Sequence, residues 1–80
     1  MKTVEQTWLE FGNAIFQPGT SVLQIKEMRR AFYAGFYAAL MAGIEMADET
    51  GDDDDAGIAA IERLHKECRE FGAAVADGRA

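Results

Sequence analysis

The sequence predicts an all-α protein: a short N-terminal helix followed by a long antiparallel helical hairpin. In three segments, apolar residues recur at spacings of three and four, as they do on one face of a helix. Each segment starts at a hydroxyl or carboxyl side chain and ends near glycine or proline, which are typical helix ends. We expect a single domain, residues 1–80, with helices at about 3–16, 21–48 and 54–77.

The first helix is predicted to begin at Thr3. Thr3 and Gln6 have the spacing of a capping box, in which each side chain bonds the backbone N–H of the other residue. The helix is expected to end before Pro18, because proline disfavours helical backbone in the residue that precedes it. Its apolar face comprises Val4, Trp8, Phe11 and Ile15.

The second helix is predicted to begin after Ser21, which has a capping-box partner in Gln24. The segment from Ala31 to Ile44 is apolar on all sides, and a helix of this kind is normally buried on all sides. Two other helices of one short chain cannot cover it, so we expect a homo-oligomer. Small residues spaced by four would let helices approach closely. The predicted interface residues are Tyr33, Gly35, Tyr37, Ala39, Met41, Gly43 and Ile44.

The third helix follows a short turn at Gly51, with one of the carboxylates of Asp52–Asp55 as its cap. A turn this short favours an antiparallel hairpin with the second helix. In that register Arg69 is expected to lie near Tyr33. The predicted inner face comprises Ile58, Ile61, Leu64, Cys68, Phe71 and Val75.

The charge distribution argues against two classes of protein. The net charge is −6, and residues 45–55 hold seven acidic residues and no basic one. The rest of the chain is nearly neutral, which argues against both a DNA mimic and a protein with a large nucleic-acid-binding face. The uncharged run Ala31–Ile44 is shorter than the roughly 17 residues that a membrane span needs. A single cysteine, Cys68, favours a cytoplasmic location.

No catalytic or metal-binding motif is complete. An EF-hand loop starting at Asp52 would have Ala56 and Arg63 at two positions that require oxygen ligands. His65 and Cys68 lie three residues apart, but zinc would need further ligands and a nucleophilic pair would need an orienting group. We therefore expect no enzyme activity, no metal and no cofactor.

Basic and aromatic residues in the second and third helices form the candidate ligand site. Arginine side chains bind phosphate oxygens, and aromatic rings stack on bases. A small anionic ligand such as a nucleotide would suit this set. In the alternative interpretation, the basic side chains form ion pairs with Glu27, Glu62, Glu67 and Glu70, while the tyrosines fill an interface. The candidate residues are Lys26, Arg29, Arg30, Tyr33, Tyr37 and Arg69.

Residues 24–35, QIKEMRRAFYAG, resemble a segment of short, uncharacterised helical proteins encoded by phages. This likeness extends over about half the chain and implies a phage or prophage origin. In the third helix, Ala60-Ile61 with Leu64, followed by residues 73–76, is similar to helical phage sponge proteins. Those proteins sequester cyclic oligonucleotide signals and blunt host immunity (anti-CBASS), and they are compact hairpins that oligomerise. This chain lacks their short proline-containing turn between the long helices.

These features together predict a non-enzymatic phage or prophage binding protein in the host cytoplasm. Its expected role is counter-defence by sequestering a small phosphorylated ligand of the nucleotide type. The alternative is a protein–protein interaction module or inhibitor that covers a host or phage protein. In that case the apolar stripe of the second helix would be the contact surface.

Overall fold

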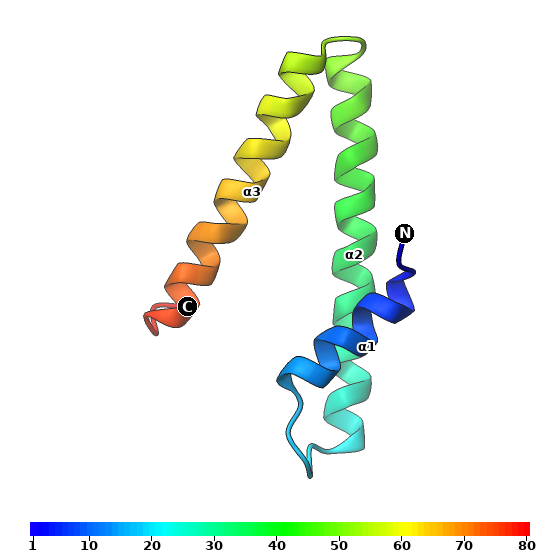
Figure 1. Cartoon of the computed structure of the whole chain (residues 1–80), viewed down its shortest axis with the longest axis vertical. Coiled ribbons are helices and arrows are strands. Elements are labelled where there is room, and N and C mark those ends of the chain that lie inside the picture. Colours follow the sequence, from blue (N-terminus) through cyan, green and yellow to red (C-terminus); the bar gives the residue numbers. More distant parts are fainter. The chain divides into compact units, whose positions relative to one another are not determined.

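The computed structural model describes residues 1–80 and contains three helices and no strand (Figure 1). They are α1 (Val4–Ile15), α2 (Val22–Thr50) and α3 (Asp54–Ala76). The predicted all-α class is confirmed, and every helix end lies within two residues of its predicted position. The chain forms two compact units, Met1–Ala42 and Gly43–Ala80, and α2 continues unbroken from one into the other. The predicted hairpin and the single domain stay predictions.

Local hydrogen bonds explain where the helices begin. The Thr3 hydroxyl accepts from the Gln6 N–H at 3.1 Å, and the Gln6 side chain accepts from the Thr3 N–H at 2.9 Å, which completes the predicted capping box. At the start of α2 the Ser21 hydroxyl accepts from the Gln24 N–H at 3.0 Å. At the start of α3 the Asp53 carboxylate accepts from the backbone N–H three residues on, so Asp53 is the cap among the four aspartates.

The turn between α2 and α3 depends on Gly51. Its φ of 55° lies in the left-handed region that side chains with a Cβ rarely adopt. The Gly51 N–H still donates to the Ala47 carbonyl at 3.0 Å, which satisfies one of the last carbonyls of α2. The predicted glycine cap is therefore confirmed.

An aromatic cluster joins α1 to α2 in the first unit, where α1 lies across α2 (Figure 1). Trp8 is the only buried residue of the chain, with 6% of its surface exposed. Its ring centroid lies 5.4 Å from that of Phe32 and 5.6 Å from that of Phe16. Phe11 adds a second contact to Phe32 at 5.2 Å. These rings hold α1 on one face of α2.

The second unit has no buried residue. Met46 and Thr50, at the end of α2, are partly covered, and a Cβ added to Gly57 of α3 would meet the Thr50 hydroxyl at 3.8 Å. The predicted inner face of α3 is exposed throughout: Leu64 is 46% exposed and Phe71 is 64% exposed. This face therefore forms no core within the second unit.

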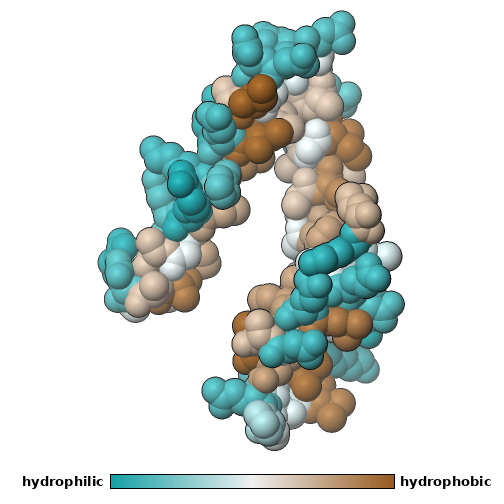
Figure 2. All heavy atoms as spheres, in the orientation of Figure 1, coloured by the Kyte–Doolittle hydropathy of each residue, from teal (hydrophilic) through white to brown (hydrophobic).

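Both units carry apolar side chains on the surface (Figure 2). Fifteen large apolar residues are exposed, in a chain with one buried residue. None of the three helices combines the length and the apolar content that a membrane crossing requires.

Candidate functional site

A basic hollow on α2 is the candidate ligand site. Lys26, Arg29, Arg30 and Tyr33 line this surface hollow, whose volume is about 350 Å³. Their spacings of three and four place them on neighbouring turns of one helical surface. The structure therefore brings together four of the six predicted ligand residues, all of them within the first unit.

Two contacts orient Arg29 in the basic hollow. Its guanidinium carbon lies 5.5 Å from the centre of the Tyr33 ring, within the range of a cation–π contact. One guanidinium nitrogen lies 4.0 Å from a carboxylate oxygen of Glu5 in α1. Both side chains of this pair are more than half exposed, so the interaction is weak. Arg29 is thus positioned while its N–H donors stay largely available.

Lys26 and Arg30 have no ion pair within the chain. In the alternative interpretation, the basic side chains form ion pairs with nearby glutamates. Glu27 lies in the same unit, but it forms no ion pair with Lys26 or Arg30. Glu70 of α3 lies 3.8 Å from Lys66. The basic hollow therefore holds three positive charges, of which two have no carboxylate partner.

The other two predicted ligand residues lie outside the basic hollow. Tyr37 follows Tyr33 by one turn of α2 and is 65% exposed, but it does not line the hollow. Arg69 lies on α3, in the second unit. Its expected place beside Tyr33 stays a prediction.

The basic hollow has the chemistry of a binding site. Arginine presents a fork of N–H donors that matches two phosphate oxygens, and lysine adds a mobile point charge. The lining residues include no histidine, carboxylate or thiol. No three or more histidine, cysteine or acidic side chains gather into a possible metal site.

The predicted interface residues fall on two sides of α2. On one side Tyr37 is 65% exposed, Ile44 is 55% exposed and Met41 is 39% exposed. On the other side, a methyl group added to Gly35 or Gly43 would meet no atom within 4 Å. Neither glycine therefore makes a close helix contact within its own unit. Tyr33 is partly covered, and Ala39 is exposed.

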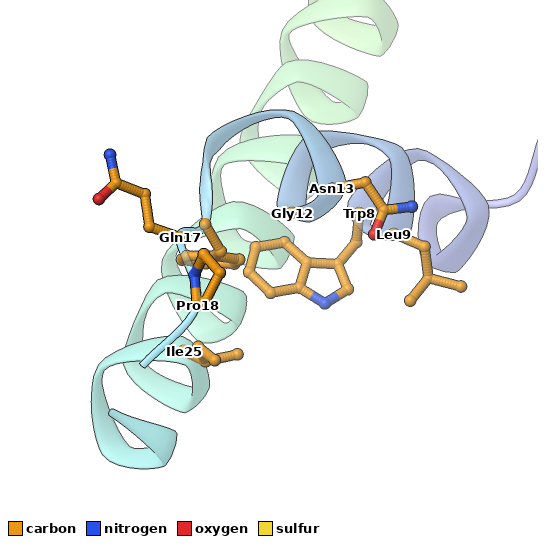
Figure 3. A pocket seen from close by; sticks show the side chains of 8 residues that line it. Trp8, Leu9, Gly12, Asn13, Gln17, Pro18 and Ile25 are labelled. Atoms are coloured by element: carbon orange, nitrogen blue, oxygen red, sulfur yellow. The ribbon is translucent and has the colours of Figure 1, made fainter. Parts of the chain in front are cut away.

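A second hollow, of about 420 Å³, lies beside Trp8 and was not predicted. In Figure 3 the indole occupies its centre, with Leu9 and Asn13 on one side and Gln17 and Pro18 on the other. It has no charged side chain, and its polar side-chain groups are the amides of Asn13 and Gln17 and the indole N–H of Trp8. The sequence contained one indication of this hollow, which is a proline that follows a helix with a tryptophan. A proline ends the helix, but it does not show in which direction the chain continues.

The fold and the basic hollow define a small all-α protein with a cationic surface site. Comparisons with known protein families, with curated proteins and with solved structures found no match.

Proposed function

We propose that this chain is a non-catalytic binding protein that takes a small phosphorylated ligand of the nucleotide class in the basic hollow. The observation that carries the proposal is the convergence of Lys26, Arg29 and Arg30 on one hollow beside Tyr33. Three cations on one surface repel each other, and a phosphate would relieve that repulsion. Two of the three have no carboxylate partner that the ligand would have to displace.

The size of the basic hollow fits a ligand of this class. Its volume of about 350 Å³ lies at the lower end of the range of about 300–1,000 Å³ for small-molecule sites. The phosphate would accept from the guanidinium groups of Arg29 and Arg30, with Lys26 as the third donor. The Tyr33 ring lies at the edge of this charge cluster, where a base could stack on it.

The biological setting belongs to the same proposal. The resemblance of residues 24–35 to phage proteins supports a phage or prophage origin. The resemblance of α3 to sponge proteins supports a role in counter-defence in the host cytoplasm, with the ligand sequestered and not converted. The exposed apolar side chains of α2 and α3 support a helical hairpin that acts as a homo-oligomer.

Calorimetry and thermal shift with a nucleotide panel test the ligand. The panel contains inorganic phosphate, nucleoside mono-, di- and triphosphates, and cyclic di- and trinucleotides. A ligand that binds only the folded state raises the melting temperature. For a nucleotide that binds, Arg30→Gln should weaken the affinity about tenfold or more, because a charge-assisted hydrogen bond contributes about 1.5–3 kcal/mol.

Arg63→Gln is the matched control for this experiment. Arg63 lies on α3, is exposed and has no ion pair, so the variant makes the same change of net charge outside the basic hollow. Equal weakening by Arg63→Gln would mean that only the net charge attracts the ligand. If no member of the panel binds at millimolar concentration, the proposed function is wrong.

The second candidate function is a protein–protein interaction module or inhibitor. The observation that favours it is the set of fifteen exposed large apolar side chains. Monomeric proteins rarely leave large contiguous apolar surfaces uncovered. Stoichiometric capture of one host or phage protein, lost in Tyr37→Asp and Ile44→Asp but kept in Arg30→Gln, would favour this function over nucleotide binding.

A further inference from the structure

One stripe of α2 runs the length of the helix at spacings of four, three and four. Eleven residues make just over three whole turns, so a stripe with this repeat stays close to one side of a straight helix. Tyr37 lies at its middle, eleven residues after Lys26 and eleven residues before Asp48. The stripe consists of Lys26, Arg30, Tyr33, Tyr37, Met41, Ile44 and Asp48; we call it the Tyr37 stripe.

Six of the seven residues of the Tyr37 stripe are exposed, and Tyr33 is partly covered. In the first unit the aromatic cluster uses a different side of α2, where Phe32 and Phe36 are partly covered. Tyr37 is 65% exposed there. In the second unit α3 begins beside Thr50, and Ile44 stays 55% exposed. No helix of the same unit therefore lies on this stripe.

The charges along the Tyr37 stripe are opposite on the two sides of Tyr37. Lys26 and Arg30 lie on the N-terminal side. Asp48 lies on the C-terminal side, and Glu45 flanks the stripe next to Ile44. None of these four side chains forms an ion pair within its own unit. A helix with this pattern is complementary to itself when one copy is reversed.

We propose that a second copy of this chain binds the Tyr37 stripe, with its α2 antiparallel to the first and a two-fold axis at Tyr37. Reversal about Tyr37 places Lys26 opposite Asp48 of the partner subunit. It places Arg30 beside Glu45 of the partner subunit, on the same flank of the interface. The two-fold axis generates each ion pair twice, as in an isologous dimer.

The middle of the Tyr37 stripe suits the same arrangement. Tyr37 faces the partner subunit's Tyr37 across the axis, and paired aromatic rings add to the free energy of apolar contact. Tyr33 faces the partner subunit's Met41, and thioether sulfur packs favourably on aromatic rings. Ala34 and Ala38, beside the stripe, are small and leave room for these larger side chains.

A parallel pair of α2 helices does not fit these charges. It would place Lys26 and Arg30 against the same two cations of the second copy. The acidic residues at the other end would likewise face each other, and like charges in contact disfavour association. The antiparallel orientation converts both repulsions into attractions.

This inference rests on the proposed homo-oligomer, but it does not need the proposed ligand. Lys26 and Arg30 also line the basic hollow. The carboxylates of the partner subunit would therefore compete with a phosphate for these two cations. The test is made without nucleotide, so its result is independent of ligand binding.

Sedimentation equilibrium of the full chain at low salt, across the micromolar range, measures the dimer. Lys26→Glu and Asp48→Lys should each weaken self-association about tenfold or more, because each change reverses two symmetry-related pairs. An equimolar mixture of the two variants should associate like the unaltered chain. In the mixed dimer, Glu at position 26 of one copy meets Lys at position 48 of the other. Arg63→Glu, on α3, is the charge-matched control and should change the dissociation constant less than twofold.

Three other outcomes would each overturn a different part of this proposal. A monomer at every concentration would overturn the homo-oligomer and the interface together. Self-association that Lys26→Glu leaves unchanged would overturn this interface and keep the oligomer. A mixture that associates no better than the separate variants would overturn the register, and far-UV circular dichroism would confirm that both variants are folded.

Chemical cross-linking gives a second measurement of the two-fold axis. Cys68 is exposed and is the only cysteine, so Cys68→Ser gives a chain without thiols. In that background a short bismaleimide should cross-link Tyr37→Cys to itself efficiently. It should cross-link Lys26→Cys to Asp48→Cys, and neither of these to itself. Efficient self-linking of Lys26→Cys would contradict the antiparallel pair.

Discussion

Phe32 joins α1 to α2, and we expect Phe32→Ala to release α1. Phe32 lies 5.4 Å from Trp8 and 5.2 Å from Phe11, centroid to centroid, and it is partly covered. Truncation of a fully buried phenylalanine costs about 3–5 kcal/mol. With part of the ring exposed, we expect a loss of about 2–3 kcal/mol in the free energy of unfolding. For a unit of 42 residues, the total free energy of unfolding is only about 2–6 kcal/mol.

Trp8 reports this change, because it is the only tryptophan and is 6% exposed. In Phe32→Ala its emission should shift to longer wavelength, and iodide should quench it more strongly. Urea titration should give a lower midpoint for the fluorescence transition. The control is Leu23→Ala, on the same helix with Leu23 66% exposed, for which we expect a loss under about 1 kcal/mol. If Phe32→Ala moves emission and midpoint no more than Leu23→Ala, the aromatic cluster does not hold α1.

Three further predictions concern helix ends and glycines, and thermal unfolding followed by circular dichroism measures each. Asp53→Ala removes the cap of α3 and should cost about 1 kcal/mol, whereas Asp52→Ala should cost less, and equal losses would contradict the assigned cap. Gly51→Ala forces a Cβ into a backbone with φ of 55° and should cost about 1–2 kcal/mol. Gly35→Ala lies in open space within a helix and should stabilise it by up to about 1 kcal/mol, and destabilisation would reveal a close contact there.

The helix ends could be predicted because their causes are local. The hydroxyls of Thr3 and Ser21 and the carboxylate of Asp53 bond backbone N–H groups within three residues of themselves, so the sequence contains both partners. The position of Gly51 after a helical pattern similarly indicated a left-handed cap. The contact between Trp8 and Phe16 is different, because it depends on the path of the chain before Pro18.

The basic hollow could be predicted in part for the same reason. Lys26, Arg29, Arg30 and Tyr33 share one helical surface, so their spacing alone brings them together. The contact of Arg29 with Glu5 was missed, because it depends on how α1 crosses α2 and helical periodicity contains no such information. The hollow beside Trp8 was missed because it lies where the chain leaves α1.

The sole tryptophan and the sole cysteine lie in different units of the chain. Trp8 is enclosed in the first unit, and Cys68 is exposed in the second. A thiol-reactive dye on Cys68 can accept excitation energy from Trp8, so resonance energy transfer measures the separation of the two units with every residue of the sequence retained. The same labelled chain would register whether added nucleotide or a second copy changes that separation.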